Sequence, residues 1–189
     1  MTDTPTIKKI IAFTGRKACG KGVAGNLLAE KYGALRIDYS SSLHEALNIL
    51  GIPETQDTIP KLSSFLRSRF GVDVMQRAVV KKIRASSASR ISLFGARRLT
   101  DFDDIKKEFS FHLLYIDSNF EARYQRYIAR NQRAGDSEMD RERFRLKDEE
   151  EPELQIESLK PLADAVIDNN ATLQEFEKKL LEVFDTLDL

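Results

Sequence analysis

The stretch TGRKACGKGVAGN, residues 14–26, is rich in glycine and contains two lysines. Gly15, Gly20 and Lys21 fit the pattern G-x-x-x-x-G-K, in which backbone amides surround phosphate oxygens and the lysine ammonium holds the outer phosphates. The helix that such a loop opens adds the positive end of its dipole. We therefore predict a nucleotide phosphate site rather than a structural turn. Its predicted residues are Gly15, Arg16, Lys17, Ala18, Cys19, Gly20, Lys21, Gly22 and Val23.

The position after the lysine departs from the usual pattern. Gly22 stands where a serine or threonine hydroxyl normally contacts Mg²⁺, and Val23 also lacks a hydroxyl. Mg²⁺ keeps much of its hydration shell in proteins, so phosphates and water can hold it without that ligand. We expect ATP and Mg²⁺ as cofactors, with the metal held mainly by phosphates and water. The sequence does not separate ATP from GTP.

Alternating apolar and helical patterns predict the elements that position this loop. Short apolar runs favour five strands; they lie at 9–14, 34–38, 91–95, 111–117 and 164–168. Hydroxyl residues followed three positions later by an acid predict N-caps at Ser42, Thr100, Ser118 and Thr172. Strands that alternate with helices indicate an α/β fold, with a mostly parallel five-stranded sheet covered on both faces.

Two intervals interrupt this alternation within a predicted single domain, residues 1–189. Residues 40–88 read as helical and are too long for one crossover, so we expect an inserted helical segment. Residues 131–153 are almost wholly polar, which favours a lid-like flap.

The sequence resembles the nucleoside monophosphate kinase group of P-loop proteins, which includes adenylate kinases and dephospho-coenzyme A kinases. The phosphate loop, the segment RNQRAGD that begins at Arg130 and residues 163–176 carry the resemblance. It implies a three-layer α/β/α P-loop NTPase fold, an acceptor-binding insert at 40–88 and an arginine-bearing lid. It also implies that the loop containing Asn169 lies beside the adenine.

Four arginines follow one another at helical spacing. They are Arg123, Arg126, Arg130 and Arg133. Fixed guanidinium groups stabilise the charge on a transferring phosphoryl group, and the resemblance favours Arg126 and Arg130 for that role. The alternative is a solvated arginine face balanced by nearby acids.

The third predicted strand ends in Phe94-Gly95-Ala96-Arg97, where related kinases often read D-G-x-R. Arg97 is a candidate for binding the acceptor phosphate because ligands bind at the carboxyl ends of parallel strands; a surface salt bridge is the alternative. Phe94 replaces the usual acid, which casts doubt on full catalytic competence.

Asp38 ends the second predicted strand and is the best remaining acid near the site. Its carboxylate could accept a proton from the acceptor or hold a water bound to Mg²⁺; a turn-capping role is the alternative. The pattern S-D-x-L-R that related kinases carry after this strand is replaced by Ser40–His44. Arg67 in the insert could supply the missing cation, or could be a surface arginine.

The bulk composition limits the classes of partner that we expect for this protein. Thirty basic and thirty acidic side chains cancel, and no basic and aromatic pattern favours nucleic acid. The single cysteine, Cys19, cannot form an internal disulfide, and no apolar run is long enough to span a membrane. We expect a cytoplasmic protein with no membrane partner; the oligomeric state stays open.

The predicted function is an ATP-dependent phosphotransferase that acts on a small nucleotide-like acceptor, a nucleoside monophosphate or dephospho-coenzyme A. Lys21, Arg126, Arg130 and Asp38 are the predicted catalytic residues, and Arg97, Arg67 and Asp38 the predicted acceptor contacts. The alternative is a nucleotide-binding protein of the same fold that has lost kinase activity, which Val23, Ser41 and Phe94 favour.

Overall fold

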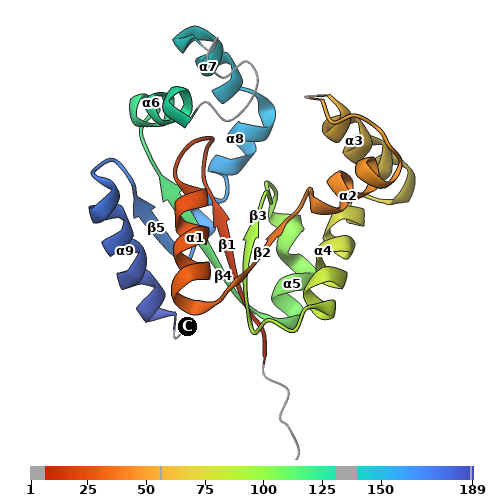
Figure 1. Cartoon of the computed structure of the whole chain (residues 1–189), viewed down its shortest axis with the longest axis horizontal. Coiled ribbons are helices and arrows are strands. Elements are labelled where there is room, and N and C mark those ends of the chain that lie inside the picture. The colour runs from red at the N-terminus through yellow and green to blue at the C-terminus, as the bar shows by residue number, and fades with distance from the viewer. Residues whose placement is uncertain (1–6, 56, 131–139, 188) are drawn as a thin grey trace, which may run out of the picture.

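The computed structural model describes residues 7–55, 57–130, 140–187 and 189 (Figure 1). Its middle layer is a five-stranded sheet of order β2-β3-β1-β4-β5, in which every neighbouring pair is parallel. The strands are β1 (Lys9–Thr14), β2 (Leu35–Asp38), β3 (Arg90–Phe94), β4 (Ser110–Asp117) and β5 (Ala165–Asp168). The predicted α/β class is confirmed, and all five predicted strands form with ends shifted by no more than about one residue.

Helices connect these strands and cover the sheet. They are α1 (Lys21–Tyr32), α2 (Ser41–Ile49), α3 (Thr58–Phe70), α4 (Val74–Ala85), α5 (Asp103–Glu108), α6 (Phe120–Arg130), α7 (Arg141–Asp148), α8 (Glu151–Glu157) and α9 (Leu173–Thr186). Two short 3-10 turns, η1 (Leu99–Phe102) and η3 (Lys160–Leu162), precede α5 and β5. Figure 1 shows α6, α7 and α8 beyond one end of the sheet and α2 and α3 beyond the same end on the other side.

Each face of the sheet packs against its own pair of helices. Successive strand residues point to opposite faces, so Ile10 and Ala12 of β1 join a core with α4 and α5, whereas Ile11 and Phe13 join a core with α1 and α9. Burying both faces explains why the strands read as continuous apolar runs rather than as alternating patterns. The result is a three-layer arrangement with β1 in the middle of the sheet.

The carboxyl ends of the strands all lie at one edge, because the sheet is parallel. The phosphate loop follows β1 at this edge and opens α1, which begins at Lys21 as the loop pattern predicts and has Gly33 as its C-cap. Asp38, Arg97 and Asn169 follow or end other strands at the same edge. The topology therefore brings the predicted site residues to the side of the sheet where α/β proteins bind ligands.

Helix capping agrees with the prediction at one start and differs at three. Thr172 caps α9, and its hydroxyl and backbone pair with Glu175 in a capping box. Ser42 lies inside α2, which begins one residue earlier. Thr100 lies inside η1. At the start of α6, Asn119 rather than Ser118 is the capping residue, because its side-chain oxygen accepts from the Ala122 amide at 2.8 Å. The predicted caps at Ser42, Thr100 and Ser118 are therefore wrong.

The two interrupting intervals contain helices. Residues 41–85 hold α2, α3 and α4, and α3 buries no residue completely. Within the second interval, residues 131–139 lie outside the described part of the chain, and α7 follows them. Phe144 anchors α7 because its ring is 1% exposed and packs on Phe120, Tyr124 and Tyr127. The roles of 40–88 as acceptor insert and 131–153 as lid stay predictions.

Within the described residues, no helix has the length and apolar character that crossing a membrane requires.

Candidate functional site

The phosphate loop, residues 15–20, turns sharply between β1 and α1. Gly20 is the residue before the helix and has a φ of 115°, which favours glycine. A Cβ at this position would lie 2.4 Å from Nδ2 of Asn169. Both the backbone angle and the close approach therefore require glycine at position 20. The first amides of α1 have no acceptor within the helix, as at the start of every α-helix, and so are available to a ligand at the loop.

Lys21 closes the loop on itself. Its ammonium donates to the backbone carbonyls of Gly15 at 2.5 Å and Arg16 at 2.9 Å, and it also contacts Cys19 Sγ at 3.6 Å. Cys19 is fully buried, so its small side chain fills space beneath the loop. In this state the cation neutralises carbonyl dipoles of the loop, and a phosphate would compete with these carbonyls for Lys21.

Two further carbonyls of the loop accept hydrogen bonds from distant elements. Asn169, in the turn after β5, donates to the Cys19 carbonyl at 2.8 Å. Arg123, in the first turns of α6, donates to the Lys17 carbonyl at 3.4 Å. Because the carbonyls of the loop are held from outside, its shape is stabilised without a bound anion.

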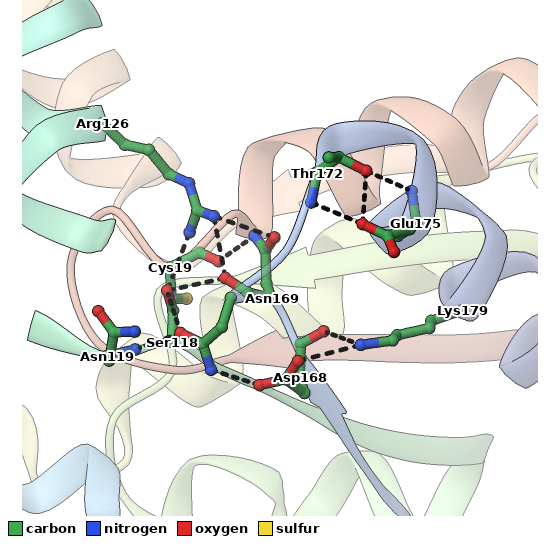
Figure 2. Close-up of polar contacts among 10 residues, drawn as sticks. Cys19, Ser118, Asn119, Arg126, Asp168, Asn169, Thr172, Glu175 and Lys179 are labelled. Carbon is green, nitrogen blue, oxygen red and sulfur yellow. Dashed lines mark hydrogen bonds and ion pairs between the residues drawn. The ribbon is translucent and has the colours of Figure 1, made fainter. Parts of the chain in front are cut away.

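A hydrogen-bonded network joins α6 to the turn after β5 (Figure 2). Arg126 donates to Ser118 Oγ at 2.9 Å, to the Asn169 carbonyl at 2.9 Å and to Asn169 Oδ1 at 3.2 Å. Ser118 Oγ in turn donates to the same carbonyl at 2.9 Å. The structure thus brings Arg126 and Asn169 together beside the loop. Ser118 belongs to this network, although its position in the sequence suggested only a helix cap.

The other predicted arginines of the stripe are placed differently. Arg123 is 3% exposed and pairs with the buried carboxylate of Asp148 in α7, with Nη2 and Oδ2 2.7 Å apart. The side chain of Arg130, and Arg133 as a whole, lie outside the described residues. The stripe therefore splits: Arg126 bonds to Ser118 and Asn169, whereas Arg123 bonds to Asp148 and to the Lys17 carbonyl of the loop.

Asp148 also holds the side chain of Arg16. Arg16 Nη1 lies 2.8 Å from Asp148 Oδ2, and Arg16 Nη2 lies 2.6 Å from Glu157 of α8. Burial raises the pKa of the Asp148 carboxyl, but the hydrogen bonds and charges of Arg123 and Arg16 outweigh it and hold the pKa below its usual range. Asp148 thus stays ionised and connects the phosphate loop, α6 and α7.

The side chains of the first loop cations point away from the loop interior. Arg16 reaches Asp148 and Glu157, and the Lys17 ammonium lies 5.2 Å from the centre of the Tyr127 ring. In this arrangement both positions contribute backbone to the loop, while their charged ends contact α6, α7 and α8.

A polar cavity of about 340 Å³ lies between the loop and α8. Its lining includes Tyr115, three cations and three carboxylates: Arg16, Arg123, Lys160, Asp117, Asp148 and Glu157. Burial, followed by the charges of Asp117 and Glu157, raises the pKa of Tyr115 to about 12. Lys160 pairs with Asp117 at 2.7 Å. The charges of the lining balance, so the cavity does not by itself favour an anion.

Asp101 of η1 contacts both predicted acceptor arginines, the backbone of Arg97 and the side chain of Arg67. Its carboxylate accepts from the backbone amides of Arg97 at 2.9 Å and Arg98 at 3.1 Å, and lies 3.9 Å from the Arg67 guanidinium. Asp101 itself is 6% exposed, and the Tyr39 hydroxyl donates to its carbonyl. Among the described residues, the exposed guanidinium of Arg97 has no hydrogen-bond or ion-pair partner. The backbone of the turn at residues 97–101 is thus fixed by hydrogen bonds, while the Arg97 guanidinium is exposed and could bind an anion.

Phe94 fills space in the core instead of supplying an acid. Its ring stacks on Phe13, with centroids 5.4 Å apart, and packs on Gly25 of α1. A Cβ at Gly25 would lie 2.1 Å from the Phe94 ring, so glycine is needed there. The nearest acid in the sheet is Asp38, the register partner of Phe94 on β2. Arg36 pairs with Asp38 through two hydrogen bonds of 2.8 and 3.0 Å.

The described residues contain no group of three or more His, Cys, Asp or Glu side chains placed to hold a metal ion. Gly22 is exposed at the start of α1 and Val23 is half-buried, and neither offers an oxygen ligand. A Mg²⁺ ion at this position would therefore take its ligands from bound phosphates and water rather than from these two residues.

Sequence reasoning missed four residues that organise the site: Arg36, Asp101, Ser118 and Asp148. Asp148 lies in the polar interval 131–153, and its burial depends on Phe144 packing α7 against α6. Ser118 was predicted only as a helix cap, and Asp101 follows the predicted cap at Thr100. Neither pattern gives information on distant partners. Arg36, two residues before Asp38 on an edge strand, was the one recognisable signal, since alternate strand residues share a face.

The proteins of similar sequence are named UPF0200 proteins, and this name describes no activity. A UPF0200 protein of Methanoculleus marisnigri is 28% identical over 173 residues, covering 91% of this chain and 93% of its own. A UPF0200 protein of Saccharolobus islandicus is 29% identical over 179 residues, covering 94% and 93%. No protein-family model matches the chain.

Several solved structures share the fold at low sequence identity. A gluconokinase from Sinorhizobium meliloti superposes with a TM-score of 0.58 at 16% identity, covering 96% of this chain and 94% of its own. A shikimate kinase from Acinetobacter baumannii, solved with shikimate, gives 0.53 at 18%, covering 97% and 96%. An uncharacterised protein from Eubacterium ventriosum gives 0.60 at 13%, covering 95% and 99%. The chain has a P-loop kinase-like fold, as its phosphate loop and strand order predict.

Proposed function

We propose that the chain transfers the γ-phosphoryl group of ATP, bound with Mg²⁺, to a nucleoside monophosphate or dephospho-coenzyme A. The shape of the phosphate loop is the observation that carries the proposal. Bonds from Lys21 and Asn169 hold loop carbonyls, while Gly20 and the first turn of α1 present amides. A loop of this kind at a helix N-terminus binds phosphate. The P-loop kinase-like fold supports the proposal.

The proposed roles follow from the positions of the side chains. Lys21 would leave the carbonyls of Gly15 and Arg16 for the outer phosphates of the donor. Arg126, with Arg130 one helical turn further along α6, would stabilise charge on the transferring group. Asn169 would hold the loop beside the nucleotide base.

The acceptor would lie on the opposite side of β1. The exposed Arg97 guanidinium, with Arg67 beside the same Asp101 carboxylate, would hold an acceptor phosphate. Asp38, two strands away from β1, would accept the proton of an acceptor hydroxyl. Closure of residues 131–153 would exclude water, which otherwise competes as the acceptor.

A second candidate is a nucleotide-binding protein without transfer activity. The buried ring of Phe94, at the strand end where an acid would serve catalysis, favours it. In this case ATP would bind the same loop, and the bound state would serve signalling or scaffolding.

One assay separates these candidates. Purified protein is incubated with ATP, Mg²⁺ and each of a panel of nucleoside monophosphates and dephospho-coenzyme A, and ADP release is coupled to NADH oxidation. Calorimetry measures ATP binding in parallel. Turnover that depends on one acceptor supports the kinase; ATP binding with no turnover on any acceptor supports the second candidate. Absence of both ATP and GTP binding contradicts the phosphate site itself.

A further inference from the structure

Asp38 and Phe94 lie side by side at the carboxyl ends of β2 and β3. They are register partners, and paired residues of neighbouring parallel strands point to the same face of the sheet. Phe94 belongs to the core beneath α1, so Asp38 lies on the α1 face as well. This is the face covered by the helix that begins with Lys21.

Arg36 fixes the carboxylate of Asp38. Arg36 Nε donates to Oδ2 at 2.8 Å and Nη2 donates to Oδ1 at 3.0 Å. Two parallel hydrogen bonds set the plane of a carboxylate as well as its distance. Each carboxylate oxygen retains a lone pair, because an ionised carboxylate offers about four acceptor sites in total. Asp38 can therefore be held by Arg36 and still accept a proton.

Arg36 is itself fixed by Phe94. The guanidinium carbon lies 4.2 Å from the centre of the Phe94 ring, within the range of a cation–π contact. The ring cannot slide inward, because it already contacts Phe13 and the open face of Gly25. Gly25 is one helical turn after Lys21, so contacts run from the helix that carries Lys21 to Asp38.

We propose that Arg36 is a positioning residue that aims Asp38 at the acceptor, and that Phe94 is the platform that orients Arg36. This inference rests on the proposed function. The step applies to an acceptor that offers a hydroxyl, as dephospho-coenzyme A does: the hydroxyl oxygen bonds to the γ-phosphorus as the bond from that phosphorus to the β–γ bridging oxygen breaks. The hydroxyl proton passes to the Asp38 carboxylate, and ADP leaves. The ring at position 94 thus contributes to catalysis by placing an acid on the neighbouring strand.

A double-mutant cycle tests the coupling. Arg36→Gln, Asp38→Asn and the double variant are assayed with the acceptor that the panel identifies, and Arg36→Lys tests the need for two parallel bonds. Arg84→Gln is the matched control, because Arg84 also pairs with a single carboxylate, Glu108, and neither residue has a proposed role in the site. All variants are first compared by thermal melting. The Arg36 and Asp38 side chains are 50% and 35% exposed, so the fold is expected to survive.

We expect Asp38→Asn to lower kcat by about 10²–10⁴-fold, the usual contribution of a general base. Arg36→Gln should lower kcat by about tenfold with little change in the acceptor KM, and Arg36→Lys should give a smaller loss. In the Asp38→Asn background, Arg36→Gln should have no further effect. Arg84→Gln should match the wild-type protein.

Other outcomes overturn the inference at identifiable points. Equal losses from Arg36→Gln with and without the Asp38 carboxylate would show that Arg36 does not act through it. An unchanged kcat in Asp38→Asn would remove Asp38 from the reaction. If the wild-type protein transfers phosphate to no acceptor of the panel, the proposed function fails, and this inference fails with it.

Discussion

Asn169 donates a hydrogen bond of 2.8 Å to the backbone carbonyl of Cys19, joining the turn after β5 to the phosphate loop across 150 positions of the chain. The N–H and C=O groups of a trans peptide point in opposite directions. Asn169 therefore turns the Gly20 amide away from itself, toward the loop interior. One side-chain amide near the end of the chain thus helps to shape a binding loop near its beginning.

Replacing Asn169 with alanine should weaken ATP binding about tenfold, which corresponds to one lost hydrogen bond of about 1–1.5 kcal/mol. Isothermal calorimetry measures the Kd. Asn170→Ala is the matched control, because Asn170 accepts from the Asn119 amide at 2.7 Å in the same turn. Equal Kd values for the wild-type protein and Asn169→Ala would contradict a role for Asn169 in loop shape.

Replacing Lys21 with alanine should lower kcat/KM for phosphoryl transfer by about 10²–10³-fold, because a fixed cation no longer stabilises the transferring charge. The measurement is the coupled assay, with ATP binding followed by calorimetry. Lys31→Ala removes an exposed lysine from the other end of the same helix and should leave both values unchanged. Wild-type kinetics in Lys21→Ala would contradict the phosphate site.

Replacing Asp148 with asparagine should lower the free energy of unfolding by about 3–5 kcal/mol, because Arg123 loses its buried carboxylate partner. Urea denaturation measures this value. Asp57→Asn is the control, since Asp57 pairs with Lys61 on an exposed surface and should cost less than about 1 kcal/mol.

The same carboxylate predicts how stability depends on pH. The pKa of Asp148 is lower in the folded protein than in the unfolded chain, so its contribution is complete above the unfolded pKa of about 3.9. It is lost as the pH falls through the folded pKa. Asp148→Asn should therefore melt with less dependence on pH below about 4 than the wild-type protein. Parallel curves in acid would contradict this prediction.

Replacing Gly25 with alanine should destabilise the protein by about 1–3 kcal/mol, because the added methyl group meets the Phe94 ring at 2.1 Å. Phe94→Leu should recover part of the loss by freeing space, although it also removes the stacking with Phe13. Urea denaturation of both single variants and the double variant measures the coupling. Additive losses would show that the two positions do not meet.

Local patterns were sufficient to predict the fold. The phosphate loop, the helix that it opens and the five strands each depend on residues close together in the sequence. The Thr172 cap was predicted for the same reason. Ser118 shows the limit, because its hydroxyl could serve a helix start or a tertiary partner. The tertiary partners, Arg126 and the Asn169 carbonyl, are the ones that form.

The contacts that organise the site depend on long-range packing. Nothing near Asp148 indicates that Phe144 buries α7 and carries this carboxylate to Arg123 and Arg16. Asp101 likewise meets Arg67 only because α3 packs near η1. The sequence shows that these residues are charged, but only the packing of the folded chain shows which of them contact the site.

The resting position of Lys21 has a consequence for which anions the loop can select. Its ammonium already has two backbone carbonyls as partners, at Gly15 and Arg16. A chloride ion or a lone carboxylate would interact with the Lys21 ammonium little more strongly than the two carbonyls that it displaces. A triphosphate carries several negative charges and would interact with it far more strongly. Under the proposed function, this competition would favour nucleotides over common monovalent anions.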